Sequence, residues 1–361
     1  MHVLVAPDKF AGTLTAVEAA AAIAEGWRGQ APDDEVDPAP MADGGPGFVD
    51  VLHEALGGDL AAVTVTGPHG EPIPAAFLQV GERAFVESAH ACGLALTDGE
   101  RAESATTWGV GELVMRAVEA GATDIVVGLG GSGTNDGGAG LLGALGATAD
   151  RPLDAGAAGL DGIGSVDLRP ARDAVSGVRL TLAADVESPL TGLFGATKTF
   201  GPQKGLTEEQ LPAVDAILEV FAAATDRRTA LEKGAGAAGG LGFALLLLGA
   251  TRRPGFDVVA EAVRLPERAR AADLVLTGEG AFDFSSRSGK VPYGVATVAA
   301  EAVRPCVALA GRVLVGAREM RALGIEAAYS LVDLVGEERA LGEPATSLAE
   351  LAARVARTWS R

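Results

Sequence analysis

Residues Asp124–Ala147 read DIVVGLGGSGTNDGGAGLLGALGA. The stretch begins with a short apolar run rich in β-branched residues, continues with glycines and small polar residues, and ends in a run of alanine, leucine and glycine. This order is typical of a buried strand, a tight loop and a helix. The stretch therefore predicts one strand–loop–helix unit of an α/β fold.

The same order of strand, polar loop and helix recurs elsewhere in the chain. A capping box, Thr15-Ala-Val-Glu18, predicts the start of a helix, and TEEQ at Thr207 and SLAE at Ser347 are expected to open two more. The recurrence predicts an α/β protein with mainly parallel sheets and flanking helices, in which ligands collect at the carboxyl ends of strands. The apolar runs that precede such loops and helices are HVLVA at 2–6, ADLVLTG at 272–278 and PCVALAG at 305–311.

The pattern changes between about residues 57 and 87. AAVTVTG at 61–67, PAAFLQV at 74–80 and RAFVE at 83–87 are short, closely spaced strand patterns separated by glycine-containing turns. They predict an antiparallel meander and a crossing between domains. The length of 361 residues agrees with two domains, or with one domain that carries a large insertion.

Charge and cysteine content exclude several classes of protein. The net charge is −19, and so acidic a surface repels nucleic-acid backbones and anionic membranes. Cys92 and Cys306 are far apart and the four histidines have no metal-ligand spacing, so neither a zinc site nor a disulfide framework is expected. The N-terminus resembles no signal peptide, and the charge-free run 234–251 is too rich in glycine for a membrane span. We expect a cytoplasmic protein.

The glycine-rich segment 128–140 is the first candidate site. Glycines allow backbone amides to approach an anion closely, and a following helix directs its positive end at the same point. Two alternatives are a turn that only packs two backbones together and, because GLGGSG matches GxGxxG with Asp150 downstream, a dinucleotide-binding loop. The candidate phosphate-binding residues are Gly130, Gly131, Ser132, Thr134, Asn135, Asp136 and Gly137.

Acidic residues in four other loops form a second candidate site. Carboxylates at strand ends can hold Mg²⁺ or accept a proton from a substrate hydroxyl, although a single Asp more often forms a turn or caps a helix. The four loops are PDKF with Asp8 and Lys9, MADGGPG with Asp43, AADVESPL with Asp185, and GEGAFDF with Glu279 and Asp283.

Two of the five lysines lie in glycine-flanked loops. Lys204 in FGPQKG and Lys290 in SGKVP are candidates for binding a phosphate or carboxylate, with a solvated surface lysine as the alternative. The segment 233–249, KGAGAAGGLGFALLLLG, is either a second anion-binding loop or a place of close helix packing.

Taken together, these segments resemble the bacterial glycerate kinase family, whose members phosphorylate D-glycerate with ATP. The resemblance spans nearly the whole chain, and seven motifs in order are far more specific than any one alone. They are APDKFAGTLTA from Ala6, PMADGGPG from Pro40, GLGGSGTNDGGAG from Gly128, ADVESPLTG from Ala184, FGPQKG from Phe200, GAGAAGGLG from Gly234 and TGEGAFDFSSRSGKVPYGVA from Thr277.

The resemblance implies a two-domain fold in which one domain is inserted into the other. We expect a discontinuous domain, 1–80 plus 285–361, and an inserted domain, 81–284, that carries the glycine-rich phosphate-binding loops. The implied reaction is ATP-dependent phosphorylation of a D-glycerate hydroxyl to phosphoglycerate, usually 2-phosphoglycerate, with Mg²⁺. We expect Asp185 and Asp283 to serve as metal ligands or base and Lys290 to neutralise charge in catalysis, while Asp8, Lys9, Asp43 and Lys204 bind substrate.

The chain departs from the family's usual motifs at several positions. Ala11 and Ala281 stand where a lysine and an arginine are usual, and Pro46 and Phe48 replace an acid and a threonine. Ala184 and Ser188 replace a common cysteine and a usual asparagine. The alternatives to a working glycerate kinase are therefore a member that phosphorylates another small hydroxy acid in a pocket reshaped by Pro46 and Phe48, a non-catalytic ligand-binding relative and, more distantly, an NAD-dependent dehydrogenase.

Overall fold

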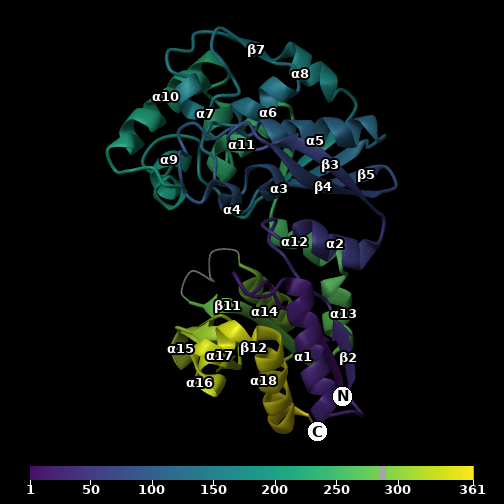
Figure 1. The fold of residues 1–361 in the computed structure, drawn as a ribbon. Helices are drawn as coiled ribbons and strands as arrows, with labels where there is room; N and C mark the ends of the chain where they lie inside the picture. The colour runs from purple at the N-terminus through teal and green to yellow at the C-terminus, as the bar shows by residue number, and fades with distance from the viewer. Residues whose placement is uncertain (284–289, 361) are drawn as a thin grey trace. The chain divides into compact units, whose positions relative to one another are not determined.

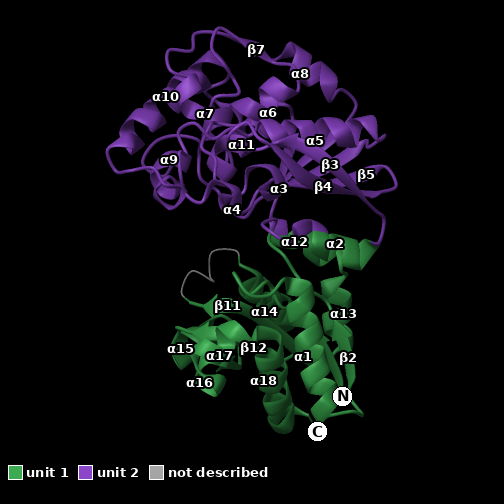
Figure 2. Ribbon diagram, viewed as in Figure 1, with its two compact units in different colours: residues 1–43, 50–56, 256–361 green, residues 44–49, 57–255 purple. Residues whose placement is uncertain are grey.

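The computed structural model describes residues 1–283 and 290–360, and within them the chain divides into two compact units (Figure 2). Unit 1 comprises residues 1–43, 50–56 and 256–361, and unit 2 comprises residues 44–49 and 57–255. The chain passes between the units at 43/44, 49/50, 56/57 and 255/256. The boundary at 49/50 lies within helix α2 (Phe48–Leu56), and the boundary at 255/256 lies within helix α12 (Gly255–Ala262). Unit 1 is therefore discontinuous in sequence.

Unit 1 is built on a five-stranded parallel sheet (Figure 1). Its strand order is β13–β12–β11–β1–β2, and because all the strands run the same way their carboxyl ends meet at one edge. The strands are β1 (His2–Val5), β2 (Glu35–Pro38), β11 (Leu274–Phe282), β12 (Cys306–Val313) and β13 (Ala327–Ser330). The helices are α1 (Ala16–Gln30), α13 (Leu265–Ala271), α14 (Val291–Glu301), α15 (Ala317–Ala322), α16 (Leu331–Val335), α17 (Glu337–Gly342) and α18 (Pro344–Trp359).

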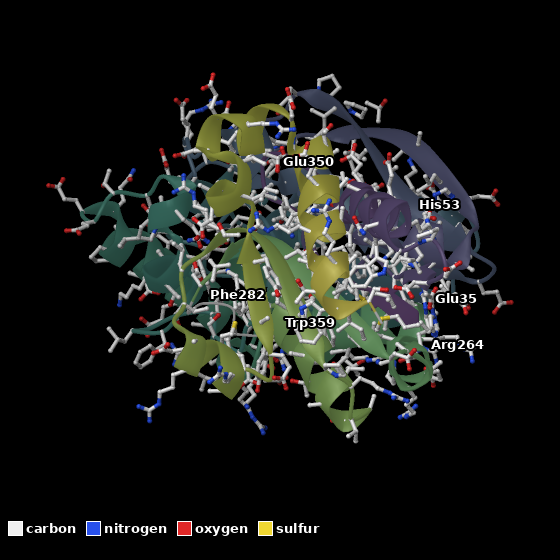
Figure 3. All side chains as sticks on the ribbon, turned by 90° about the horizontal axis from the view of Figure 1, so that it is seen from below. Glu35, His53, Arg264, Phe282, Glu350 and Trp359 are labelled. Carbon is white, nitrogen blue, oxygen red and sulfur yellow. The ribbon has the colours of Figure 1, made fainter. Side chains whose placement is uncertain are left out.

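Helices α1 and α18 lie side by side against this sheet (Figure 1). The capping box starts α1 as predicted, because the Thr15 side chain accepts from the Glu18 amide at 3.1 Å while the Glu18 carboxylate accepts from the Thr15 amide at 2.9 Å. Trp359 lies at the far end of α18 (Figure 3). Its indole N–H donates to the Tyr329 hydroxyl at 3.1 Å. The two helices approach so closely at Gly26 that an added Cβ would lie 2.0 Å from the Ala349 carbonyl oxygen.

This close approach gives a direct test of the packing in unit 1. Gly26→Ala is expected to lower the free energy of unfolding by about 2–4 kcal/mol, because the new methyl group must push two helix backbones apart. Gly29→Ala is the matched control, since it lies in the same helix with no atom within 4 Å of an added Cβ. The control is expected to gain up to about 1 kcal/mol from helix propensity. Thermal unfolding of both variants measures the difference, and equal stability would contradict the packing.

Unit 2 is built on a mixed six-stranded sheet with the order β10–β9–β6–β5–β4–β3. Strands β3, β4 and β5 form an antiparallel meander. Strands β6, β9 and β10 continue the sheet in parallel with β5. The strands are β3 (Asp59–Thr66), β4 (Pro72–Val80), β5 (Arg83–Glu87), β6 (Asp124–Gly128), β9 (Arg179–Ala183) and β10 (Thr251–Arg253), and a separate antiparallel pair is formed by β7 (Thr148–Ala149) and β8 (Val166–Asp167).

The helices of unit 2 are mostly short. The two longest, α5 and α10, pack with the small-residue helices α6 and α11 around the glycine-rich segment (Figure 1). The helices of unit 2 are α3 (Ala89–Cys92), α4 (Leu94–Thr97), α5 (Trp108–Glu119), α6 (Ala139–Ala144), α7 (Gly156–Gly159), α8 (Arg169–Ala174), α9 (Ala196–Phe200), α10 (Gln210–Ala224) and α11 (Leu241–Leu247), with 3₁₀ turns at Pro202–Lys204, Thr229–Leu231 and Ala237–Gly240.

The α/β fold class and the predicted meander are confirmed, but two details differ. Ser347 does not open a helix: it lies inside α18, which begins three residues earlier, at Pro344. The boundary near residue 80 is also wrong as a unit boundary, because β4 pairs along its length with β5 and both strands belong to unit 2. At the other end, β11 pairs with β1 and belongs to unit 1. The expected boundary at 284/285 lies outside the described residues.

The free cysteines and the glycine-rich run also have a defined place. Cys92 and Cys306 are both buried and unbonded to each other, and burial raises the pKa of each thiol to about 12. The run 234–251 contains α11 and a 3₁₀ turn, both within the core of unit 2. Among the described residues, no helix is both long enough and apolar enough to cross a membrane.

Candidate functional site

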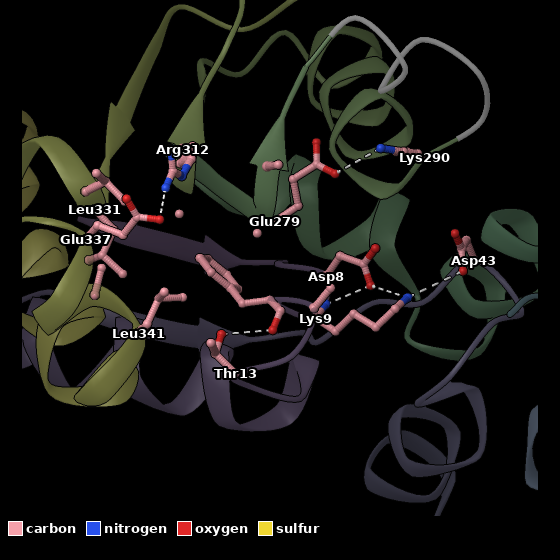
Figure 4. A pocket seen from close by; sticks show the side chains of 17 residues that line it. Asp8, Lys9, Thr13, Asp43, Glu279, Lys290, Arg312, Leu331, Glu337 and Leu341 are labelled. Atoms are coloured by element: carbon pink, nitrogen blue, oxygen red, sulfur yellow. Dashed lines mark hydrogen bonds and ion pairs between the residues drawn. The ribbon is translucent and has the colours of Figure 1, made fainter. Parts of the chain in front are cut away.

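Unit 1 has a cavity of about 410 Å³ near the carboxyl ends of β1, β11 and β12 (Figure 4). Charged groups line one part of it and apolar side chains the other. The lining residues are Asp8, Lys9, Phe10, Ala11, Thr13, Asp43, Glu279, Gly280, Ala281, Lys290, Gly311, Arg312, Leu331, Val332, Glu337, Ala340 and Leu341. The parallel strands thus gather residues from three sequence motifs into one site.

Asp8 and Lys9 follow β1, where the chain leaves the sheet. Asp8 is 6% exposed, and its carboxylate accepts from the Lys9 amide at 2.7 Å. The Lys9 ammonium lies 3.6 Å from Asp8 and 3.9 Å from Asp43 (Figure 4). Burial raises the pKa of Asp8 from 3.8 to about 6, against the attraction of Lys9, and the nearby Asp43 adds to the rise. The predicted grouping of Asp8, Lys9 and Asp43 is therefore present.

Lys290 and the end of β11 form the other charged wall. Lys290 is the N-cap of α14, and its ammonium lies 3.8 Å from both Glu279 and Asp283. Glu279 lies on β11, lines the cavity and is 6% exposed. The structure brings Asp283 and Lys290 together, as expected from one motif. Residues 284–289 of that motif lie outside the described part of the chain.

The remaining wall of the cavity is largely apolar and ends in one ion pair. Leu331 and Leu341 line the side away from Asp43, and Arg312 on β12 pairs there with Glu337 (Figure 4). Sequence reasoning did not single out Arg312 or Glu337. The only local signal was that Arg312 directly follows the apolar strand pattern PCVALAG, a position where cavity-lining residues collect.

In unit 2 the glycine-rich segment follows β6 but is mostly buried. Gly130 and Gly131 retain some exposure, whereas all residues from Ser132 to Gly140 are buried. An added Cβ at Gly133 would lie 2.3 Å from the Thr97 hydroxyl, and one at Gly138 would lie 2.4 Å from the Ala244 methyl group. Close packing therefore requires the buried glycines, and only the part near Gly131 is open to solvent. The second glycine segment packs here too, since a Cβ at Gly239 would lie 2.0 Å from the Thr134 carbonyl oxygen.

Asp136 organises the buried part of this loop. It is fully buried, and its carboxylate accepts from the Thr107 amide and hydroxyl at 2.9 and 2.8 Å. It also accepts from the amides of Gly138 and Gly140 at 2.8 and 3.1 Å. Burial raises the pKa of Asp136, while these hydrogen bonds act in the opposite direction. Its hydrogen bonds therefore join the loop to Thr107 at the start of α5.

Lys204, from another segment, and Asn135 of the loop itself are also buried. Lys204 is 2% exposed, and its ammonium donates to the Ser132 hydroxyl at 2.8 Å and to the Thr134 carbonyl at 2.6 Å. Burial lowers the pKa of Lys204 from 10.5 to about 8. The Asn135 amide donates to the Thr197 hydroxyl at 2.9 Å. In this arrangement Lys204 holds the loop, whereas the sequence predicted that it would bind substrate.

The segment Gly44–Val49 packs against the exposed part of the loop. The Gly130 amide donates to the Gly44 carbonyl at 2.9 Å, and a Cβ at Gly131 would lie 2.6 Å from the Pro46 ring. Phe48 is fully buried and meets Phe85 edge to face, with 6.2 Å between ring centroids. The expectation that Phe48 reshapes a pocket is therefore wrong, because its ring belongs to the core of unit 2.

Asp185 follows β9 in unit 2 and so belongs to a different unit from Asp283. Its carboxylate accepts from the Gly255 amide at 3.0 Å. Ala184, just before it, is a buried core residue at 5% exposure. Among the described residues, no cluster of three or more acidic, histidine or cysteine side chains forms a ready metal site.

Several buried polar atoms at this end of unit 2 have no hydrogen-bond partner in the described structure. They are the Ser88 hydroxyl, the Thr134 hydroxyl, the Asn135 side-chain oxygen and the Ser188 hydroxyl. These residues follow β5, β6 and β9, three neighbouring parallel strands, so they lie at one edge of the sheet. Because buried polar groups are nearly always paired, this edge is suited to a polar ligand.

The dinucleotide-binding alternative does not fit the local structure. The third glycine of a dinucleotide motif opens a helix, but α6 begins at Ala139, six residues after Gly133. Asp150 lies in an exposed turn, where its carboxylate accepts from the Gly164 amide at 3.1 Å. The loop therefore lacks the helix and acid that a dinucleotide site needs.

Comparisons with known proteins agree with the motifs. The model of the glycerate kinase family matches residues 3–360. Glycerate kinase of Bacillus subtilis is 39% identical over 92% of this chain and 90% of its own, and glycerate 2-kinase of Escherichia coli is 37% identical over 93% and 92%. A crystal structure assigned as glycerate kinase 2 from Salmonella typhimurium superposes with a TM-score of 0.83 at 37% identity, covering 99% of this chain and 98% of that one. The chain belongs to the glycerate kinase family.

Proposed function

We propose that this protein transfers the γ-phosphoryl group of ATP to a hydroxyl of D-glycerate, giving 2-phosphoglycerate. The observation that carries the proposal is the cavity of unit 1, where buried Asp8 and Glu279 lie among lysines in a member of the glycerate kinase family. The name of the Escherichia coli relative, glycerate 2-kinase, supports the position of transfer.

In this proposal Asp8 accepts the proton of the attacking hydroxyl. A general base works best when its pKa lies near the working pH, and the pKa of Asp8, about 6, is close to that range. Lys9 and Lys290 would attract the anionic substrate and offset charge that develops during transfer. Asp43 would orient Lys9, to which it is ion-paired.

The nucleotide phosphates would bind at the exposed part of the glycine loop in unit 2. Gly130, Gly131 and the unpartnered Ser88 and Ser188 hydroxyls support this assignment. Mg²⁺ needs only one or two carboxylates when phosphate oxygens complete its shell, so Asp185 or Asp283 could hold it together with ATP. The metal would supply charge neutralisation. We also assign the enzyme to the cytoplasm, in keeping with its two free cysteines.

A larger hydroxy acid is the second candidate substrate. The cavity of about 410 Å³ falls within the size range of sites for much bulkier ligands than a three-carbon acid. Ala11 and Ala281 leave room in its lining, and Leu331 offers an apolar contact.

ADP release from MgATP, measured with D-glycerate and a panel of larger hydroxy acids, tests the proposal. Rapid turnover with D-glycerate is expected, and coupling in the ³¹P NMR spectrum identifies the product, since phosphate on C2 gives a doublet and on C3 a triplet. Turnover only with a larger acid would make that acid the substrate. ADP release with none of them would contradict the kinase assignment.

Asp283→Asn tests the metal-binding role that we give to this carboxylate. Turnover is expected to fall by about 10²-fold or more, because a neutral amide binds Mg²⁺ more weakly than a carboxylate. The unfolding temperature should not change, because the Asp283 side chain is 37% exposed. Asp257→Asn, an exposed acid on α12, is the matched control. Near-normal turnover in Asp283→Asn would remove it from the site.

A further inference from the structure

The register of the unit 1 sheet brings Arg312 to the cavity. Strands β11 and β12 are parallel, with Ala281 paired to Arg312. Partners in register point to the same face of a sheet, and Glu279, two residues before Ala281, shares that face. All three residues line the cavity (Figure 4). Because the Ala281 side chain ends at Cβ, the long side chain at this pair of positions is that of Arg312.

The three cations that line the cavity in the described structure have different surroundings. Lys9 lies between Asp8 and Asp43, and Lys290 lies between Glu279 and Asp283, so each ammonium already faces two carboxylates. The described ion pair of Arg312 is with one carboxylate, Glu337. Arg312 is therefore the cavity cation with the most remaining capacity for a second anion.

The chemistry of the guanidinium suits a carboxylate ligand. Arginine presents five N–H donors in a planar fork, so one edge can hold Glu337 while the other binds a second carboxylate with two parallel hydrogen bonds. The pair itself contributes little to stability, because the side chains of Arg312 and Glu337 are 47% and 60% exposed. What distinguishes the Arg312–Glu337 pair is its position at the cavity, at the border between the charged and apolar walls.

We propose that Arg312 binds the carboxylate of the acid substrate. This inference rests on the proposed function, and it adds a substrate-binding residue to the same site. With the carboxylate at Arg312, the rest of the acid would extend along Ala281 toward Glu279 and Asp8. In this arrangement the positive charge of Arg312, at the border of the cavity, selects an acid over a neutral polyol.

Steady-state kinetics of Arg312→Gln test this role. The KM of the acid substrate is expected to rise about 10- to 100-fold, the usual effect of losing a charge-assisted hydrogen bond, while the KM of ATP changes little. Arg312→Lys should recover part of the loss, because a point charge remains without the fork. An increase in the KM of ATP with no change for the acid would overturn the proposal, since Arg312 would then contact nucleotide phosphate.

Two further variants separate substrate binding from a structural role. Glu337→Gln breaks the same ion pair but keeps the cation, so the KM of the acid should stay within about threefold of wild type. If Glu337→Gln behaves like Arg312→Gln, the pair is structural and the proposal fails. Arg354→Gln, an exposed arginine on α18 outside the cavity, is the matched control and should resemble wild type.

Equilibrium binding of D-glycerate separates failure of this inference from failure of the proposed function. If wild type binds the acid without turnover, the proposed function fails, and a 10- to 100-fold weaker Kd in Arg312→Gln still supports the inference. If wild type turns over and Arg312→Gln has a normal KM for the acid, only the inference fails. If wild type binds no acid, both are overturned.

Discussion

Asp8→Asn is expected to lower turnover by about 10²- to 10⁴-fold while making the folded protein more stable at pH 8. Asparagine has the shape of the aspartate and still offers an oxygen to the Lys9 amide, but it cannot accept a proton. Steady-state ADP release and differential scanning calorimetry on one preparation measure both effects. A substitution that only damages the fold lowers both turnover and stability. A fall in turnover together with a rise in stability therefore identifies Asp8 as a functional residue that destabilises the fold.

The pH dependence of stability follows from the raised pKa of Asp8. Its pKa rises from 3.8 in the unfolded chain to about 6 in the fold, so the fold binds this proton more tightly. The stabilising contribution of Asp8 is complete below about pH 4 and is lost as the pH rises through 6. At pH 8 the ionised, buried carboxylate costs about 3 kcal/mol, which Asp8→Asn avoids. The gain in stability should be about half as large at pH 5.

The rate has the opposite dependence on pH. In the wild type kcat/KM should rise as the pH passes about 6, because Asp8 must lose its proton before it can act as a base. Asp50→Asn, an exposed acid on α2, is the control and should keep both the rate and its pH profile. If Asp8→Asn retains the wild-type rate, the proton is accepted elsewhere. If its stability advantage does not change with pH, the carboxylate is not buried as described.

Asp136→Asn is expected to have the largest effect on stability, a loss of about 3–5 kcal/mol. Four donors converge on the Asp136 carboxylate inside the core of unit 2. An asparagine would turn an amide N–H₂ toward some of these donors, leaving buried N–H groups without an acceptor. Because the same donors set the path of the glycine loop, ATP binding should weaken as well.

Calorimetry and ATP titration of Asp136→Asn measure these two losses. Asp154→Asn, an exposed acid in the same unit, is the control and should change stability by less than about 0.5 kcal/mol. Wild-type stability in Asp136→Asn would mean that the folded protein already holds a protonated carboxyl group, because an amide can replace that neutral form.

Many local features of this protein could be predicted from the sequence because they depend on neighbouring residues. The Thr15–Glu18 capping box, the meander between 57 and 87, and the strand before the glycine loop arise from short-range hydrogen bonds and from periodicity. The motifs of the family are also short, so Asp8, Lys9 and Asp43 could be grouped by their motifs alone, and the cavity brings them together.

The remaining features depend on contacts between residues far apart in the chain. Lys204 and Lys290 both follow glycine-containing loops, yet Lys204 is 2% exposed whereas the side chain of Lys290 is 35% exposed and lines the cavity. No local pattern distinguishes them, because burial is decided by what packs over each loop. Phe48 is a similar case, since the ring of Phe85 and not its own motif determines its place in the core.

The sequence by itself determined the α/β class, the recurring order of strand, loop and helix, the family and most of the charged residues of the cavity. Only the tertiary structure decided which strands share a unit, that the glycines of 133–140 are needed for close packing, and that Arg312 stands beside Ala281. The physical reason is range: periodicity and capping act over a few residues, whereas register, burial and the desolvation that raises the pKa of Asp8 depend on segments distant in sequence.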